Sequence, residues 1–370
     1  MPVCTQEQRL NDLEFAYLNN DSPANDELDA FVRAQPGGSA YHLAAWRRAV
    51  ADAYGYPGQV LVARRAGQVA GLLPLSAVAR PLGKPRWISL PFCDLGGPLA
   101  VSLEVAEALA AHARKDVGAA GATGLELRCS AQETVEEAAL EGRKVRMLLG
   151  LPDSAAALMQ SYPPKLRSQV RKAEKNGLTS EVVTSAAAVA EFYEVYSRNM
   201  RRLGSPPHSR GWFEGIHRHY SAAGDMFIVI VRHEGKPVGA GWVLRSGDKA
   251  VIPWASTLAD YNPLAPNMLL YWAIQSYLCE HGVRQFDFGR STYGEGTYKF
   301  KKQWGAVPVA LDWKEWDAQG VAQGVTTAVA PATSGGAKSS LRPLVESAWQ
   351  KLPLAVTNSL GPRLRRYITL

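Results

Sequence analysis

The sequence lacks the cysteine and histidine spacings that build metal sites or disulfide frameworks. Its four cysteines lie far apart along the chain: Cys4, Cys93, Cys129 and Cys279. No pair has CxxC spacing. His217 and His219 are two residues apart on an expected helix, so their side chains point to different faces. We therefore predict no bound metal, no resident cofactor and a reducing, cytoplasmic setting.

Long apolar runs and the common nucleotide motifs are also missing. No apolar run is long enough to span a bilayer, and the charged first turns leave no apolar region for a signal peptide. The chain has no P-loop, no dinucleotide-binding fingerprint and no GxSxG elbow. Nucleotide-hydrolysing and redox chemistry therefore have no support.

The chain does have enough hydrophobic residues for a core, and a modest excess of basic over acidic residues. Hydrophobic residues make up 46% of its 370 residues, which fits two soluble domains or one large domain. Lys and Arg number 41 against 34 for Asp and Glu, so the net charge is +7. This excess suits an anionic substrate, a nucleic acid or a membrane surface, and it does not distinguish between them.

One order of elements occurs twice along the chain. This order is a helix, a hairpin with a glycine turn, a strand, a second helix and a short strand with a central acidic residue. It runs over 39–128 and again over 191–290. Within the repeat, hairpin 59–75 matches 226–244. Repetition over this length predicts two related domains of α/β (α+β) class, with sheets covered by helices.

The composition then divides the chain into four parts. We predict an N-terminal domain over 1–150 and a C-terminal domain over 151–317. Residues 318–340 are rich in Ala, Gly, Thr and Ser, as in a flexible linker. Residues 341–370 form a cationic amphipathic tail, which can dock on its own protein, on a partner or on a membrane surface. Of these, docking on its own protein is slightly favoured.

The segment KLRSQVRKAEKNGL predicts a helix with a strongly basic face. Glu174 is its one acid, set among five bases: Lys165, Arg167, Arg171, Lys172 and Lys175. A solvated helix face is the ordinary interpretation of such charges. However, neighbouring bases at i, i+4 repel each other when no acid separates them. This cost slightly favours an anion-binding role.

The stretch RQFDFGRSTYGEGTYKFKKQWGA, residues 284–306, carries the strongest pattern for a site. A short apolar strand ends at Gly289-Arg290, a loop with two glycines follows, and a basic aromatic segment over 297–304 comes next. Loops at strand ends carry groups that a rigid core positions. Phe300 and Trp304 share a face at i, i+4, which predicts that they anchor in the core while Lys301 and Lys302 turn elsewhere. The alternative is a solvated lysine run beside two core aromatics.

Four segments resemble the FemAB-like proteins of the GNAT superfamily, most of all the group associated with exosortase/PEP-CTERM and exopolysaccharide loci in Gram-negative bacteria. They are LRSQVRKAEKNGL, NMRRLGSP, WASTLADYNPLAPNMLLYW and FDFGRSTYGEGTYKFKKQWGA. The resemblance spans roughly 41–316 and implies two tandem GNAT-like domains. Fem relatives transfer an aminoacyl group from a charged tRNA to a cell-wall precursor. Phe300-Lys301 matches their Phe-Lys pair. GNAT enzymes often have a tyrosine general acid four residues before a glycine in this segment, and the resemblance implies that Lys301, four residues before Gly305, takes its place.

Two departures from the family pattern leave the acyl donor open. GNAT enzymes that use acetyl-CoA hold its pyrophosphate at a glycine-rich turn before a helix. The matching residues here, 261–268, include Pro263 and Pro266 and no glycine. The coiled-coil arm of the tRNA-using relatives is also not visible. The co-substrate is therefore expected to be an aminoacyl-tRNA or an acyl-CoA.

The resemblance implies an acyl- or aminoacyl-transferase of EC class 2.3, acting on an amine of an envelope or exopolysaccharide precursor. Lys301 would stabilise the oxyanion and Asp287 would orient Lys301 or the attacking amine. Tyr298 is a second proton donor. The expected substrate-binding residues are Lys165, Arg167, Arg171, Arg290, Phe300 and Asn267. The acceptor would be a small molecule or a lipid-linked glycan, at the inner face of the cytoplasmic membrane.

The alternative function is a non-catalytic GNAT-fold scaffold that binds an anionic polysaccharide or lipid-linked intermediate. A DNA partner is not expected, because the aromatics are scattered and do not alternate with bases along one strand. A deep pocket that joins Lys301, Asp287 and the Arg167 row would favour an enzyme. A flat basic face with Lys301 exposed would favour the scaffold.

Overall fold

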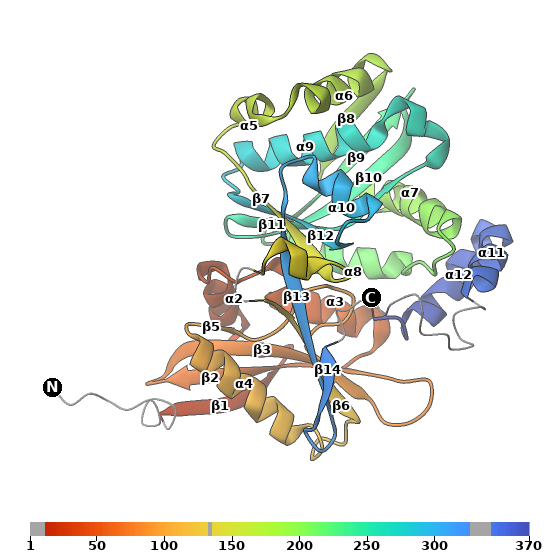
Figure 1. Cartoon of the computed structure of the whole chain (residues 1–370). Helices are drawn as coiled ribbons and strands as arrows, with labels where there is room; N and C mark the ends of the chain where they lie inside the picture. Colours follow the sequence, from red (N-terminus) through yellow and green to blue (C-terminus); the bar gives the residue numbers. More distant parts are fainter. Residues whose placement is uncertain (1–11, 132–134, 326–341, 370) are drawn as a thin grey trace. The chain divides into compact units, whose positions relative to one another are not determined.

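The computed structural model describes residues 12–131, 135–325 and 342–369 (Figure 1). Its contacts divide the chain into two compact units. Unit 1 takes its described residues from Met1–Val135, Ala310–Ala328 and Thr369–Leu370. Unit 2 takes them from Glu136–Val309 and Val329–Ile368. Among the described helices, none is long and apolar enough to cross a membrane.

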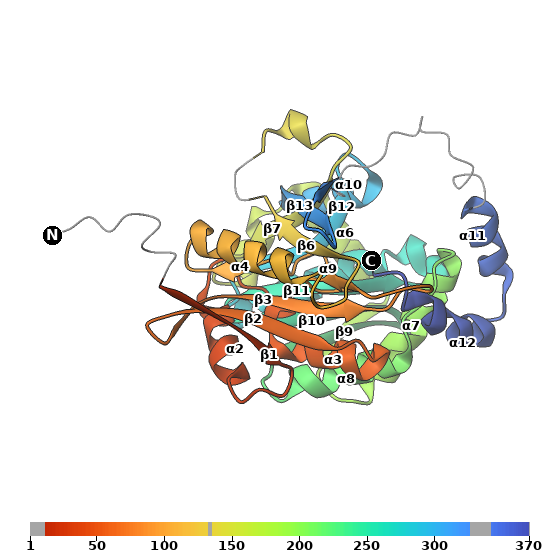
Figure 2. The same ribbon diagram turned by 90° about the horizontal axis from the view of Figure 1, so that it is seen from below.

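Unit 1 is a twisted sheet with helices on both faces. In spatial order its main strands are β1 (Leu13–Asn19), β2 (Gly58–Arg65), β3 (Gln68–Val78), β4 (Arg86–Ile88), β6 (Gly124–Ser130) and β13 (Val307–Asp317). Two short strands, β5 (Leu99–Ala100) and β14 (Ala322–Val325), pair with β3 and β13. Helix α4 (Leu103–Asp116) covers one face, and α2 (Asn25–Ala34) and α3 (Ala44–Tyr54) cover the other (Figure 2).

Unit 2 has a second sheet with its own helices. Its strands in spatial order are β7 (Lys144–Gly150), β12 (Gln285–Thr292), β11 (Lys249–Thr257), β10 (Lys236–Ser246), β9 (Met226–His233) and β8 (Leu178–Val183). Only β11 and β12 run parallel; the other neighbours are antiparallel. The helices that cover the sheet are α5 (Ala155–Ser161), α6 (Pro164–Lys175), α7 (Ala188–Arg202), α8 (Arg210–Ser221), α9 (Pro266–Glu280) and α10 (Gly296–Lys302).

The hairpins at the centre of the two sheets follow the same plan. The β2–β3 turn has positive φ at Ala66 and Gly67, and the β9–β10 turn has positive φ at Glu234 and Gly235. Two consecutive positive φ values define the type I′ turn, whose twist matches that of the paired strands. The returning strands β3 and β10 are each eleven residues long and have identical burial patterns. The repeat found in the sequence is therefore also present in three dimensions.

The tail forms two helices that pack on unit 2. Helix α11 (Arg342–Lys351) and helix α12 (Leu354–Arg365), separated near Pro353, both contact α7. Trp349 and Thr357 are buried in this contact. At Gly361 a Cβ atom would come within 2.4 Å of Pro207, so only glycine allows the approach. Docking on its own protein, the favoured interpretation of the tail, is confirmed.

The units differ from the predicted boundaries in two places. Residues 144–150, placed in the first domain from sequence, form β7 and pair antiparallel with β12 in unit 2. Residues 310–317, placed in the second domain, belong to β13 and pair with β6 in unit 1. Part of the predicted linker forms β14, and residues 326–340 of it lie outside the described residues. Both differences come from long-range strand pairing, which local composition does not reveal.

Candidate active site

A β-bulge in the middle of β12 organises the candidate site. The pairing of β12 with β7 shifts by one residue between Asp287 and Arg290, and Gly289 has a φ of 73°. An extra residue in one strand leaves backbone groups outside the ladder. Here the carbonyl oxygens of Gly289 and Arg290 both accept hydrogen bonds from Lys301 Nζ, at 3.0 and 2.9 Å. The bulge thus provides two acceptors for one ammonium group.

Lys301 is buried, with only 8% of its surface exposed. It lies on α10, and its neighbour Lys302 is exposed. A buried ammonium group requires hydrogen-bond acceptors, which the two carbonyls supply. The expectation that Lys301 and Lys302 both turn away from the core is therefore wrong for Lys301. The short helix buries Lys301, and Trp304, which follows the helix, is also buried, with 1% of its surface exposed.

Aromatic rings surround this lysine segment. Phe300 packs edge-on against Tyr271, with ring centres 5.1 Å apart, and Tyr271 stacks on Phe288 at 5.4 Å. Trp304 packs against Phe300 and against Tyr162. Such contacts fix α10 on the sheet and on α9, as the i, i+4 pattern of Phe300 and Trp304 predicts.

Asp287 is held by groups other than Lys301. Its carboxylate accepts hydrogen bonds from Arg146 Nε at 2.9 Å and from the Gly289 N–H at 2.8 Å, and Arg146 Nη2 lies 2.7 Å away. The direct orientation of Lys301 by Asp287, expected from the sequence, is therefore replaced by an indirect one. Asp287 fixes the bulge, and the bulge carbonyls hold Lys301.

Arg146 is a site residue that sequence reasoning missed. It lies on β7, 141 positions before Asp287, and only the β7–β12 pairing brings the two together. The alternation in KVRMLLG places Arg146 on the same face as Lys144. No local motif identifies its partner.

Tyr298 belongs to a polar cluster beside the lysine. It is buried, and its hydroxyl donates to Glu137 Oε1 at 3.3 Å. Lys302 Nζ lies 2.8 Å from the same oxygen and 5.5 Å from the centre of the Tyr298 ring. The Lys302 ammonium holds the pKa of the Glu137 carboxyl below its usual range. Glu137 was also not predicted from the sequence.

The basic helix α6 has the orientation that its pattern predicts. Leu166, Val170 and Ala173 are buried, and the bases lie on other faces. An open cavity of about 530 Å³ is lined by Pro164, Arg167, Ser168, Arg171, Lys172 and Lys175. Among the described residues, none of the five bases of α6 has an ion-pair partner. This surface therefore offers unneutralised positive charge to an anion.

A second cavity of about 610 Å³ lies in the same unit. Pro163 lines the second cavity and Pro164 lines the first. The second also includes the ends of β7 and α10, with Tyr162, Lys302 and Gly305 among its walls. Neither of the two cavities is lined by Lys301 or Asp287. They therefore do not form the single pocket that would join Lys301, Asp287 and the Arg167 row. Lys301 is also not exposed on a flat basic face.

The remaining predicted residues lie on other elements of unit 2. The turn before α9 has Ala265 in the left-handed region and Pro266 at the first helical position, and Asn267 follows, half-buried. Asn176, at the end of α6, donates to the Leu264 carbonyl of this turn at 3.3 Å. Because proline has no N–H, the turn offers fewer backbone donors to a pyrophosphate than a glycine-rich one would. Arg290 is half-buried on β12.

Comparisons with known proteins match this part of the chain. Residues 162–302 match the family model described as acetyltransferase (GNAT) domain, a range that contains α6, β12 and α10. The UDP-N-acetylmuramoylpentapeptide-lysine N(6)-alanyltransferase of Weissella viridescens is 24% identical over 140 residues. That alignment covers 36% of this chain and 41% of the relative, so the chain matches less than half of the relative's length.

Solved structures share the fold over most of the chain. FemX superposes with a TM-score of 0.65 at 17% identity, over 80% of this chain and 95% of FemX. A C-terminal domain of a putative lysylphosphatidylglycerol synthetase from Agrobacterium fabrum gives 0.53 at 16% identity, over 88% and 96%. The predicted α/β fold with tandem GNAT-like units is confirmed by these neighbours and by the repeated hairpins.

Proposed function

We propose that this protein is an acyl- or aminoacyl-transferase that acts on an amine, with its active site in unit 2. The observation that carries the proposal is Lys301, buried on two bulge carbonyls within the segment that matches the GNAT domain. A buried lysine at a strand bulge is not needed for a sheet to fold. The alanyl transfer to lysine named for the Weissella relative supports the same class of reaction.

The reaction forms a bond between the amine nitrogen and the acyl carbon. The bond from that carbon to the donor's oxygen or sulfur then breaks, and the leaving atom takes up the proton that the amine releases. Between these steps the acyl oxygen carries negative charge. In this proposal Lys301 stabilises that charge, and the two carbonyl hydrogen bonds that fix its ammonium before the substrate arrives support this role. Tyr298 is the second proton donor.

Asp287 has a positioning role in this proposal. Its carboxylate holds the Gly289 N–H and Arg146, and so keeps the bulge in the form that directs two carbonyls at Lys301. The substitution Asp287→Asn would retain one acceptor and lose the charge that pairs with Arg146. The role of Asp287 is therefore to hold Lys301, without contact to the reacting atoms.

The α6 surface is the proposed site for the anionic part of the donor. Aminoacyl-tRNA and acyl-CoA both carry phosphates, and guanidinium groups such as those of Arg167 and Arg171 match phosphate in geometry. Asn267, Lys165, Phe300 and Arg290 would complete the donor and acceptor contacts.

The acceptor class follows from the motif resemblance. Similarity to the group associated with exosortase/PEP-CTERM and exopolysaccharide loci supports an amine on an exopolysaccharide or lipid-linked envelope precursor. Such a precursor would bring the protein to the inner face of the cytoplasmic membrane.

The test begins with donor binding. Thermal unfolding is measured with acyl-CoAs, aminoacyl-tRNA and nucleotide-sugar intermediates, since a ligand that binds the native state raises the midpoint. One donor class should stabilise the wild type, and the shift should fall sharply in Arg171→Ala. Lys236→Ala, which removes an exposed base from a hairpin of the same unit, should keep the shift. Transfer of the acyl group from that donor to an amine is then followed directly.

One outcome would instead favour the non-catalytic scaffold: stabilisation by any polyanion that salt abolishes and that Arg171→Ala leaves unchanged.

A further inference from the structure

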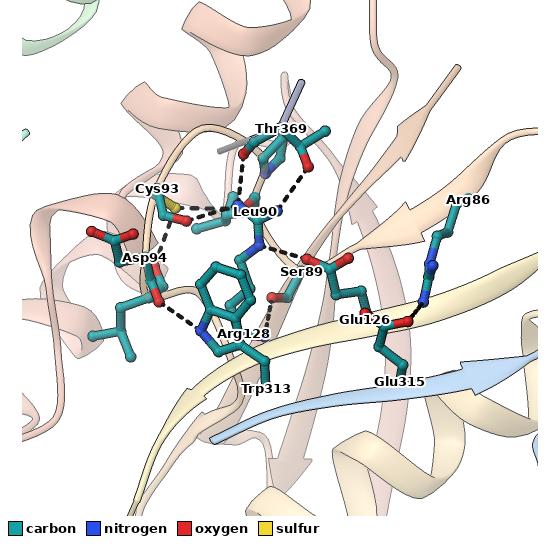
Figure 3. Close-up of polar contacts among 12 residues, drawn as sticks. Arg86, Ser89, Leu90, Cys93, Asp94, Glu126, Arg128, Trp313, Glu315 and Thr369 are labelled. Atoms are coloured by element: carbon teal, nitrogen blue, oxygen red, sulfur yellow. Dashed lines mark hydrogen bonds and ion pairs between the residues drawn. The ribbon is translucent and has the colours of Figure 1, made fainter. Parts of the chain in front are cut away.

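Unit 1 contains a fully buried arginine that the proposed reaction does not use. Arg128, on β6, has no exposed surface. Its Nε donates to Glu126 Oε1 and its Nη1 to the Cys93 carbonyl, both at 2.8 Å (Figure 3). The guanidinium lies over the Trp313 ring, 4.7 Å from its centre. A buried guanidinium is strongly destabilising unless its N–H groups find acceptors.

Further acceptors come from one residue near the end of the tail. Arg128 Nη1 donates to the Thr369 carbonyl and Nη2 to the Thr369 hydroxyl, both at 2.9 Å. The Phe92 N–H donates to the same carbonyl at 2.7 Å. Thr369 thus receives three hydrogen bonds from unit 1, two of them on its main-chain oxygen (Figure 3).

The donors are held by the loop that surrounds Arg128. The Arg128 N–H donates to Ser89 Oγ, and the Arg128 carbonyl accepts from the N–H groups of Gly96 and Gly97. Trp313 Nε1 donates to the Asp94 carbonyl at 3.1 Å, so the stacked ring is also tied to this loop. None of these hydrogen bonds involves Thr369, so they hold the loop in place independently of Thr369.

Phe92 has a backbone conformation that favours this arrangement. Its φ is 66°, in the left-handed region that side chains other than glycine seldom adopt. The ring packs against those of Tyr54 and Tyr56, with centres 4.5 and 6.5 Å away. Strained residues persist where their surroundings hold them, and they gather at binding sites. Here the strained residue presents an N–H to a peptide oxygen.

We propose that the 89–97 loop and Arg128 form a peptide-recognition site, and that the chain's own segment around Thr369 occupies it as a resident ligand. The ligand class is an extended peptide residue with a main-chain carbonyl and a γ-hydroxyl, as in threonine or serine. Without such an occupant, the Phe92 N–H and two guanidinium N–H groups would lose their acceptors. The site lies within unit 1 and does not rest on the proposed transfer reaction.

The resident segment is attached to the chain, so its effective concentration at the site is high, in the millimolar range for a short tether. A free peptide of the same sequence therefore has to compete with it. Weakening the resident segment should open the site to a peptide in solution, and the recognition chemistry can then be measured separately from the tail.

The experiment follows hydrogen exchange of the Phe92 amide in the full chain. In Thr369→Val this amide should exchange about tenfold faster, because one guanidinium N–H loses its acceptor. Millimolar acetyl-Tyr-Ile-Thr-Leu should restore the protection, and acetyl-Tyr-Ile-Val-Leu should not. The Ser89 amide, bonded to the Glu126 carbonyl in the same unit, should not change.

Thr357→Val is the matched control on the same tail. Its buried hydroxyl donates to the Leu354 carbonyl within α12, so its loss should leave Phe92 protected. Equal Phe92 exchange in wild type and Thr369→Val would overturn the resident contact. Faster exchange that the threonine peptide cannot reverse would overturn peptide recognition. Neither readout depends on transfer activity, so this proposal and the proposed reaction fail separately.

Discussion

At the scale of single residues, the candidate chemistry depends on how one ammonium group is held. Lys301 lies between two carbonyls that a bulge has released from strand pairing. The Phe-Lys pair and the glycines could be found in the sequence, because they are contiguous. Arg146 and Glu137 could not, because each is brought to the site by a contact across more than a hundred residues.

Replacement of this lysine should abolish transfer with little change in fold. Lys301→Met keeps the length of the side chain and removes the charge, and loss of one oxyanion donor costs about 100–1,000-fold in turnover. Lys299→Met, on the exposed side of the same helix, should stay within a few-fold of the wild type. Turnover and far-UV circular dichroism are measured for both. Full turnover by a folded Lys301→Met chain would contradict the catalytic role of Lys301.

The bulge itself can be tested at Gly289. Its φ of 73° is strained for any residue with a Cβ, so Gly289→Ala should destabilise unit 2 by about 1–2 kcal/mol and displace the carbonyls that hold Lys301. Gly150→Ala is the control, since no atom lies within 4 Å of the added Cβ and its φ is not positive. Urea unfolding gives the stability. Equal midpoints for the two variants would mean that the bulge is not strained.

At the scale of elements, periodicity predicted α6 well and α10 poorly. The apolar row of α6 is buried as its spacing predicts. In α10 the helix is only seven residues long, and the bulge acceptors decide which lysine turns inward. A pattern of residue types cannot contain that information, because the acceptors belong to backbone groups of another element.

The exposed apolar residues of the tail lead to a prediction about lipid binding. Four apolar side chains remain between 41% and 47% exposed beside Arg363 and Arg366: Leu360, Leu364, Tyr367 and Ile368. We propose that they contact anionic lipid. The affinity for phosphatidylglycerol vesicles, measured by sedimentation, should fall about thirtyfold in the double variant Leu360→Asn with Leu364→Asn, since each leucine contributes roughly 1 kcal/mol.

Two controls test whether this lipid contact is specific. Leu103→Asn, which removes a half-exposed leucine from unit 1, should sediment like the wild type. Binding to neutral phosphatidylcholine should be much weaker, because the arginines then lack anionic partners. Undiminished sedimentation of the double variant would rule out a lipid role for α12.

At the scale of the whole molecule, a half-buried thiol in unit 1 and a buried thiol in unit 2 give a separate signal for each unit. Burial raises the pKa of Cys129 in unit 1 to about 12 and that of Cys279 in unit 2 to about 11. The thiolate is the reactive form, so both should resist a disulfide reagent at pH 8 until their unit opens. A Cys4→Ser chain is labelled at increasing urea and analysed by mass spectrometry, and the labelling of Cys129 reports unit 1 while that of Cys279 reports unit 2.

The sign of the pH effect follows from the same shifts. A native thiol with a raised pKa keeps its proton when the unfolded thiol has lost it. The stabilisation is complete below the ordinary thiol pKa, near 8.5, and declines as the pH rises toward the native value. Stability should therefore fall between about pH 8.5 and 11. Rapid labelling of Cys129 without urea would contradict the raised pKa of its thiol.

The course of the chain through the two units has a consequence for biosynthesis. Strand β6 is complete by Ser130, but its partner β13 in unit 1 pairs with it only from Leu311 onward. All of the residues that build the sheet of unit 2 leave the ribosome in between. The nascent chain can therefore close the second sheet before the first has its last main strand, although domains usually fold in the order of synthesis. Until then, the growing polypeptide has an open β6 edge that a chaperone would need to shield.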